Sequence, residues 1–226
     1  MSNITSFLTR RYQITLALIL IIIFSVIGVF FLQQPNKPIP LVKGYLLKNP
    51  VNLPFFTLED HKKQGFDKTS LVGYWHVIAY GYLTCPDICP MTLVTLSHLA
   101  QQLQDEELAP EIKFIFYSID PLRDSSEKLA SYLAYFDSAF IGLRAFDNKN
   151  KTIFEKSLSI KVNISMPITH PTNYAVSHDV ALFIINPKGQ LQAVFKPNNT
   201  TFNSGPFDAK VIYVDLLKVL AYYQAS

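Results

Sequence analysis

The longest apolar stretch of the chain lies near its start, where the 19 residues Ile14–Leu32 contain no charge. As a helix they would extend about 28 Å, close to the hydrocarbon thickness of a bilayer, about 30 Å. A cleaved signal peptide is the main alternative, but Gln33–Asn36 offers no small-x-small cleavage site. Arg10 and Arg11 directly precede the run, so the positive-inside rule places residues 1–13 in the cytoplasm or matrix. The pattern predicts an uncleaved transmembrane anchor over residues 14–32.

Beyond this run, short apolar strand-like segments alternate with helical patterns. Strands are predicted at 55–58, 74–82, 112–119, 181–186 and 191–195, and helices at 90–104, 124–136, 149–158 and 208–223. Asp124, with Glu127 three residues later, is predicted to cap the helix 124–136. Pro187–Gly189 predicts a hairpin between the last two strands. Residues 140–177 are poorly periodic and are expected to carry an insertion or a loop.

This order of elements predicts an α/β fold, a thioredoxin-like mixed sheet with flanking helices, preceded by one N-terminal transmembrane helix. The expected organisation is a short cytoplasmic N-terminus (1–13), the anchor (14–32), a proline-rich linker (33–54) and a thioredoxin-like domain (55–226).

Charge and cysteine content narrow the classes of function. The chain has 20 basic and 17 acidic residues, with no run of like charge, so nothing indicates nucleic-acid binding. Two cysteines are too few to staple a domain of this size, which indicates that the thiols serve chemistry rather than structure.

Both cysteines fall in one hexapeptide, Cys85–Pro90, between a predicted strand and a predicted helix. On a regular helix, Cys85 and Cys89 would share one face with Cβ atoms about 6 Å apart. A relaxed disulfide needs about 3.8 Å, so it requires a looser turn, whereas one metal ion spans the gap more easily. The helix N-terminus favours the thiolate form that either use needs. Soft thiolates select Cu(I) or Zn(II), and two of them leave either ion in need of another ligand.

Histidine is the favoured type for that further ligand, and five are present, at positions 61, 76, 98, 170 and 178. His178 directly precedes the apolar run Val180–Ile185, whose strand would fix its position. Taken alone, a histidine at the start of a strand is more often structural than a ligand.

Three ordered motifs resemble the SCO/SenC family of copper chaperones: Gly81–Pro90 (GYLTCPDICP), Ser118–Asp124 (SIDPLRD), and Ser177–His178 followed by Ala181–Gly189 (ALFIINPKG). With an anchor in front, they cover most of residues 55–222. Members of that family are thioredoxin-like, membrane-tethered proteins. The resemblance implies that Cys85, Cys89 and His178 bind a copper ion, as Cu(I) or Cu(II).

The function that the resemblance implies is that of a metallochaperone, rather than an enzyme, which assists assembly of the dinuclear copper centre of cytochrome c oxidase. The implied partners are the copper-binding subunit of the oxidase, other copper chaperones or thioredoxin-like reductants, and the membrane through residues 14–32. The expected location is the bacterial inner membrane, single-pass, with the soluble domain in the periplasm. The mitochondrial inner membrane, facing the intermembrane space, is the alternative.

Other uses of the two thiols remain open. A thiol–disulfide oxidoreductase would use Cys85 and Cys89 as a redox pair to reduce the copper-ligand cysteines of the oxidase subunit. A zinc site is a further alternative, although no fourth ligand is evident. A peroxidase of the same fold is disfavoured, since peroxiredoxins carry Thr or Ser three residues before the reactive cysteine, where this chain has Tyr82 or Pro86.

The chain also departs from the family pattern beside the implied ligands. Ser177 stands where an acidic residue is common before the histidine, and Thr84 where an aromatic residue is common. Asp87 and Asp179 are the acidic neighbours of the implied ligands, and we expect them to tune or orient the site.

Overall fold

The structure is a computed structural model that describes residues 13, 15–28, 38–104, 112–165, 174–197 and 205–225. The chain divides into two compact units, Met1–Pro38 and Ile39–Ser226.

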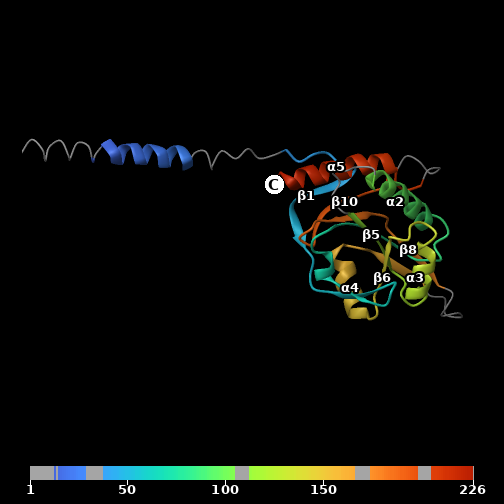
Figure 1. The fold of residues 1–226 in the computed structure, drawn as a ribbon. Coiled ribbons are helices and arrows are strands. Elements are labelled where there is room, and N and C mark those ends of the chain that lie inside the picture. The colour runs from blue at the N-terminus through green and yellow to red at the C-terminus, as the bar shows by residue number, and fades with distance from the viewer. Residues whose placement is uncertain are drawn as a thin grey trace, which may run out of the picture. The chain divides into compact units, whose positions relative to one another are not determined.

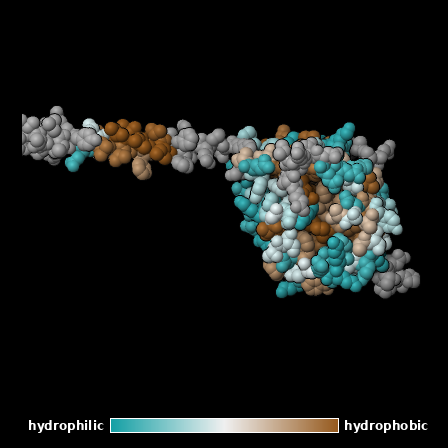
Figure 2. Space-filling model, in the orientation of Figure 1, coloured by the Kyte–Doolittle hydropathy of each residue, from teal (hydrophilic) through white to brown (hydrophobic). Residues whose placement is uncertain are grey.

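In the first unit, residues 15–28 are helical, and the apolar side chains of residues 16–27 are largely exposed (Figure 2). Across the described residues, no helix combines the length and the apolar character that crossing a bilayer requires. Residue 14 and residues 29–32 of the predicted span lie outside the described residues.

The second unit holds the remaining elements. In chain order they are β1 (Gly44–Asn52), β2 (Thr57–Asp60), β3 (Gly65–Asp67), the 3₁₀ helix η1 (Lys68–Leu71), β4 (Trp75–Gly81), α2 (Ile88–Gln104), β5 (Ile112–Ser118), α3 (Ser126–Leu133), β6 (Ile141–Arg144), α4 (Asn148–Ser157), β7 (Val162–Ser165), β8 (Ala175–His178), β9 (Leu182–Ile185), β10 (Gln190–Phe195) and α5 (Ala209–Gln224).

Eight strands form one mixed sheet in the order β1-β10-β9-β4-β5-β6-β2-β3, while β7 and β8 form a separate two-stranded ribbon (Figure 1). The pairs β4–β5 and β5–β6 are parallel, and β9 runs antiparallel to β4. The loops that follow β4 and β5 therefore leave the same edge of the sheet, and the chain enters β9 at that edge too. The predicted mixed sheet with flanking helices is confirmed.

Both faces of the sheet are covered by apolar side chains. Along β4, Trp75, Val77 and Ala79 pack with side chains of α2, α3 and α5. The alternate residues Ile78 and Tyr80 pack on the opposite face with side chains of α4 and β8. Figure 1 shows α2 and α5 side by side, away from α4. Because β4 is buried over its whole length, the loop that follows it is held by the most protected part of the sheet.

Two stretches differ from the sequence prediction. Residues 33–54 were predicted to be a linker, but Gly44–Asn52 forms β1, paired with β10. β1 lies at an edge and its register shifts between Leu46 and Val51, which allows Pro50 to sit in a strand without breaking a central ladder. Residues 140–177 were expected to carry an insertion or a loop, but they contain β6, β7 and part of β8 in addition to α4, which was predicted at 149–158.

The predicted cap at Asp124 is wrong. The helix α3 begins at Ser126, and its N-cap is Ser125, whose side chain accepts the Lys128 N–H. Asp124 is 1% exposed, and its carboxylate accepts hydrogen bonds from the Leu83 N–H and the Ser118 hydroxyl instead. A buried carboxylate requires hydrogen-bond donors, and the Leu83 N–H and the Ser118 hydroxyl supply them.

Candidate metal centre

Both cysteines lie where the loop after β4 passes into α2. Cys85 precedes the helix, which begins at Ile88, whereas Cys89 lies in its first turn. The two cysteines are therefore not both on a regular helix, and the shared helix face considered from the sequence does not apply. A turn in which the Cys85 N–H donates to the Tyr82 carbonyl (3.1 Å) sets the first thiol ahead of the helix. This is the looser geometry in which both a metal bridge and a disulfide are feasible.

The two thiols are free and unlike each other. Cys85 is half-buried, and Cys89 is 2% exposed. A hydrogen bond from the Cys89 thiol lowers the pKa of Cys85 to about 3, and His178 contributes in the same direction. That hydrogen bond, together with burial, raises the pKa of Cys89. Cys85 is therefore the sulfur that ionises first, which suits it to act as the first metal ligand or as a nucleophile.

The sulfur of Cys89 occupies space that a side chain at position 81 would fill. A Cβ added at Gly81 would lie 2.4 Å from Cys89 Sγ and 3.3 Å from the ring of Phe116. Gly81 is the last residue of β4, and because it has no side chain the thiol of Cys89 can pack against the backbone of this central strand.

His178 ends β8 and reaches the cysteine loop from a distant part of the sequence. Its Nε2 lies 4.0 Å from Cys89 Sγ. Its Nδ1 lies 2.6 Å from the carbonyl oxygen of Asp179, and because a carbonyl only accepts, Nδ1 carries the proton. Nδ1 is thus occupied by this hydrogen bond, which leaves Nε2, the nitrogen on the side of Cys89, as the atom available to bind a metal.

The topology explains why His178 arrives there. It lies four residues before β9, and the entrance to β9 is at the sheet edge where β4 ends. Two tyrosines of the β4 segment flank the imidazole, with ring centroids 5.3 Å (Tyr80) and 6.0 Å (Tyr82) from that of His178.

A hollow of about 230 Å³ joins the two segments, and its walls include Tyr82, Cys85, Pro86, Asp87, Ile88, Val176, Ser177, His178 and Val180. A larger hollow of about 470 Å³ lies between residues 41–43 and α5, and none of the described residues that line it is a cysteine or a histidine. Cys85 and His178 thus share one surface depression, with Cys89 beneath it.

The three predicted ligands are brought together without forming a closed site. Within the described ranges, no three Cys, His, Asp or Glu side chains are arranged as a ready-made metal site. The 4.0 Å between Cys89 Sγ and His178 Nε2 is still shorter than a metal–sulfur and a metal–nitrogen bond laid end to end, about 4.3 Å. One ion can therefore touch both atoms after only small side-chain movements.

The two acidic neighbours act through their backbones. The backbone N–H of Asp87 contributes to the low pKa of Cys85, and the carbonyl of Asp179 accepts from His178. Of the other histidines, His76 is fully buried in β4, His61 bonds to Gly142, and His98 is exposed on α2. His170 lies outside the described residues.

Sequence reasoning missed Gly81, Tyr80 and Tyr82 as parts of this site. Alternation along β4 already puts Tyr80 and Tyr82 on one face, but which segment covers that face depends on pairing across the sheet. A glycine just before a cysteine loop is a weak signal for close packing, and it was available.

Comparison with known proteins gives one family. The sequence profile described as SCO1/SenC matches residues 47–204. The human mitochondrial protein named SCO2 homolog is 32% identical over 135 residues, which cover 59% of this chain and 50% of that protein. The chain thus matches about half the length of this relative.

Solved structures agree with the fold. The crystal structure of yeast Sco1 with copper bound superposes with a TM-score of 0.66 and 25% identity, covering 77% of this chain and 91% of that one. BsSco, whose structure is described as containing a disulfide switch and as that of a Sco-family cytochrome c oxidase assembly protein, gives a TM-score of 0.55 and 20% identity over 77% of this chain and 98% of that one.

Proposed function

The chain belongs to the SCO1/SenC family, and from that membership we propose that it binds a copper ion and delivers it during assembly of the dinuclear copper centre of cytochrome c oxidase. The receiving partner in this proposal is the copper-binding subunit of the oxidase. Copper is cargo here: it is received, held and passed on.

One observation carries the proposal. Two segments that are 89 residues apart in sequence bring Cys89 Sγ and His178 Nε2 to 4.0 Å, beside the thiol of Cys85. Two thiolates and a neutral imidazole form a soft donor set that suits Cu(I). The depression at their surface leaves the ion accessible to a partner, which a carrier requires and a purely structural metal site does not.

Metal analysis of the full chain tests the proposed ligands. We expect about one copper ion per chain in the wild type, none retained after Cys85→Ser, and binding at least about tenfold weaker after His178→Ala, a difference of about 1.4 kcal/mol. Ser97→Ala is the control. Ser97 lies on α2 eight residues beyond Cys89, and its hydroxyl donates to the carbonyl of Phe136 rather than to any residue of the candidate site. Copper retained equally by all four proteins would remove these residues from the site.

A second candidate function is thiol–disulfide exchange with the cysteines of the oxidase subunit. The observation that favours it is the pair of free thiols in a loose turn, with the half-buried Cys85 poised as a thiolate. The two functions are compatible, because the metal leaves the thiols before they form a disulfide.

His178→Ala separates the two functions. An oxidoreductase still exchanges disulfides in this variant, because Cys85 and Cys89 both remain, whereas a copper carrier loses affinity. The reduction potential of the Cys85–Cys89 pair is a second test. Thiol–disulfide exchange requires a potential in the range of thioredoxin-like proteins, about −270 to −120 mV. A couple well below about −300 mV rules out exchange as the function.

The membrane part of the proposal concerns residues 14–32 as a single-pass anchor, with residues 1–13 in the cytoplasm and the domain in the periplasm or, alternatively, the intermembrane space. The exposed apolar side chains of residues 16–27 support it, since water disfavours such a surface. Tethering would keep the copper site close to a membrane-embedded oxidase and to other copper chaperones or thioredoxin-like reductants.

A further inference from the structure

The strand that carries His178 does not belong to the main sheet. β7 and β8 form their own ribbon, in which Val162 stands opposite His178. Ladder hydrogen bonds of the eight-stranded sheet therefore do not fix the distance between the imidazole and the cysteine loop. The entry of the chain into β9 four residues later brings the imidazole near the end of β4, and side-chain contacts to the ribbon then hold it in place there.

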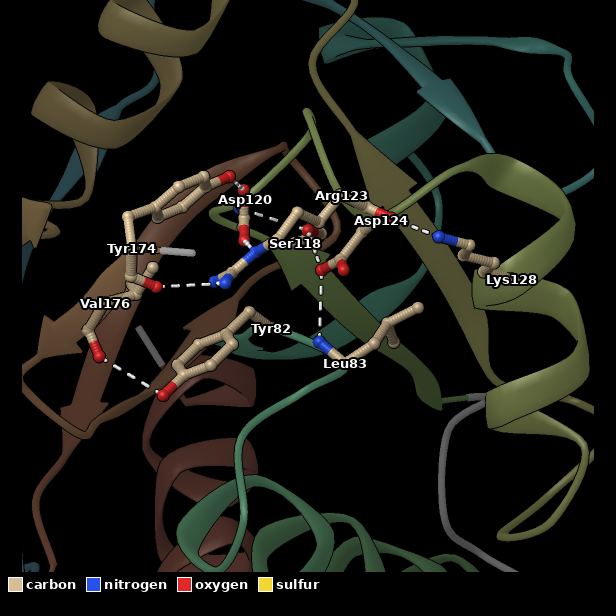
Figure 3. A network of polar contacts seen from close by, with 9 residues as sticks. All are labelled: Tyr82, Leu83, Ser118, Asp120, Arg123, Asp124, Lys128, Tyr174 and Val176. Carbon is tan, nitrogen blue, oxygen red and sulfur yellow. Dashed lines mark hydrogen bonds and ion pairs between the residues drawn. The ribbon is translucent and has the colours of Figure 1, made fainter. Parts of the chain in front are cut away.

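The 119–124 loop, which follows β5, supplies such contacts to the ribbon (Figure 3). Arg123 Nη1 donates to the carbonyl of Tyr174 at 3.0 Å, and its guanidinium lies 4.0 Å from the centre of the Tyr174 ring. Asp120 accepts from both the Arg123 Nε and the Tyr174 hydroxyl. Asp120 is 2% exposed and Tyr174 is 5% exposed, so water competes little for these charge-assisted bonds. Tyr174 is thereby fastened four residues before His178.

The same loop also holds the cysteine side. Asp124 accepts the N–H of Leu83 at 3.1 Å, two residues before Cys85. A direct link completes the arrangement, because the Tyr82 hydroxyl donates to the carbonyl of Val176 at 3.2 Å, two residues before His178. One short loop is thus bonded to both halves of the candidate site (Figure 3).

We propose that the 119–124 loop sets the position of His178 relative to the two cysteines, with Arg123 as the positioning residue. The inference rests on the proposed copper-binding function, because only a shared ligand makes that relative position matter. Arg123 is suited to the role because its planar group reaches the Asp120 carboxylate and the Tyr174 carbonyl together, which the single ammonium of a lysine does less well.

Cu(I) affinity, measured on the full chain by competition with a coloured chelator, tests the role of Arg123. We expect Arg123→Gln to weaken binding about tenfold or more, and Arg123→Lys to recover part of the loss. In the His178→Ala background, Arg123→Gln should cause no further loss, since the ligand that it positions is gone. An equal loss in both backgrounds would overturn the proposal, because the arginine would then act on the cysteines or on the fold as a whole.

Lys218→Gln is the matched control. Lys218 on α5 makes the same two kinds of contact as Arg123, an ion pair three residues back to Asp215 and a hydrogen bond to a distant backbone carbonyl, that of Leu41. It should leave Cu(I) affinity unchanged in both backgrounds. A loss equal to that of Arg123→Gln would show that general destabilisation explains the effect and would also overturn the proposal.

Hydrogen exchange on the copper-free protein supplies a second readout. Arg123→Gln should speed amide exchange in β7 and β8 while leaving β4 and β9 protected as in the wild type. Unchanged exchange in the ribbon would overturn the proposal without any reference to copper. If instead His178→Ala binds copper as tightly as the wild type, the proposed ligand set fails, and the exchange measurement still decides whether Arg123 holds the ribbon.

Discussion

Gly81 shows how closely a single position constrains the candidate site. The second thiol lies against the bare end of β4, so any side chain there competes with the sulfur for one volume. Neither neighbour can retreat easily, because Cys89 and Phe116 are both within 2% of complete burial.

Gly81→Ala should therefore displace Cys89, lower the free energy of unfolding by about 1–3 kcal/mol and weaken copper binding. Gly65→Ala is the control, since a Cβ at Gly65 meets nothing within 4 Å. Urea denaturation and copper titration of both variants check this. Unchanged copper binding in Gly81→Ala would mean that the sulfur is free to move.

His76 gives the domain a pH dependence of its own. Burial first, and the neighbouring Lys113 second, lower the pKa of His76 from about 6.5 to about 4. Below pH 6.5 the unfolded chain therefore takes up a proton that the folded chain refuses until about pH 4. The resulting stability is fully present above pH 6.5 and is lost as the pH falls through that window.

Between pH 7 and pH 4.5 we expect this histidine to remove about 2–3 kcal/mol of stability. His76→Phe should make the decline shallower by that amount, since it keeps an aromatic ring in place without a titrating group. Urea unfolding followed by the fluorescence of Trp75, which is buried, provides the measurement. Parallel pH profiles for the two proteins would contradict the assignment.

Secondary-structure elements explain why Asp124 and Ser125 differ in role although they are adjacent. Ser125 caps α3 at the surface, whereas Asp124 points inward and satisfies the backbone ahead of the cysteine loop. The cap predicted from the sequence is one residue too early, because the side chain of Asp124 bonds to buried donors instead of to the backbone N–H groups at the start of α3.

Ser125→Ala should lower stability by about 1 kcal/mol and leave copper binding intact. Asp124→Ala leaves the Leu83 N–H and the Ser118 hydroxyl without their acceptor, so we expect a larger loss, about 1–3 kcal/mol for each buried group, together with weaker copper binding. Thermal unfolding and copper titration distinguish the two. A larger loss of stability in Ser125→Ala than in Asp124→Ala would contradict these roles.

Local patterns predicted the elements that depend on local physics. The β9–β10 hairpin with Gly189 at φ 69°, and α4 over nearly the predicted residues, follow from turn chemistry and periodicity. β1 was not predicted because its Pro50 is unusual in a strand and is tolerated only at the edge of the sheet. The β7–β8 ribbon was not predicted because neither segment shows a strand pattern by itself, and only their pairing makes them strands. The two thiols were evident from their spacing, whereas selecting His178 among five histidines needed the family resemblance. The bonds of the 119–124 loop to Leu83 and Tyr174 could not be predicted, since they link segments 41 and 51 residues apart in sequence.

At the scale of the whole molecule, the apolar helix and the globular unit have different surfaces. Residues 16–27 expose aliphatic side chains almost continuously, whereas the globular unit shows mixed polar and apolar patches (Figure 2). Membrane attachment through residues 14–32 would account for this contrast.

Replacing Ile21 and Ile23 with lysine should release the protein from membranes, since each charge at the centre of a spanning helix costs about 2.5–3.5 kcal/mol. Retention of the chain in the membrane pellet after alkaline carbonate washing is the measurement. Leu41→Lys, an exposed residue of the globular unit, is the control and should stay in the pellet. Equal retention of the double variant would exclude this segment as the anchor.

The two-stranded ribbon has a further consequence for a carrier. The proposed sulfur ligands lie beyond the end of β4, a central strand of the eight-stranded sheet. The imidazole lies instead on the separate ribbon, which packs on the sheet through Val176 and is hydrogen-bonded to the 119–124 loop and to Tyr82. Local opening of the ribbon breaks only part of the contacts of the domain, so it should need less free energy than complete unfolding, about 5–15 kcal/mol. In the proposed carrier, the ion could then be released from the His178 side while the eight-stranded sheet stays folded.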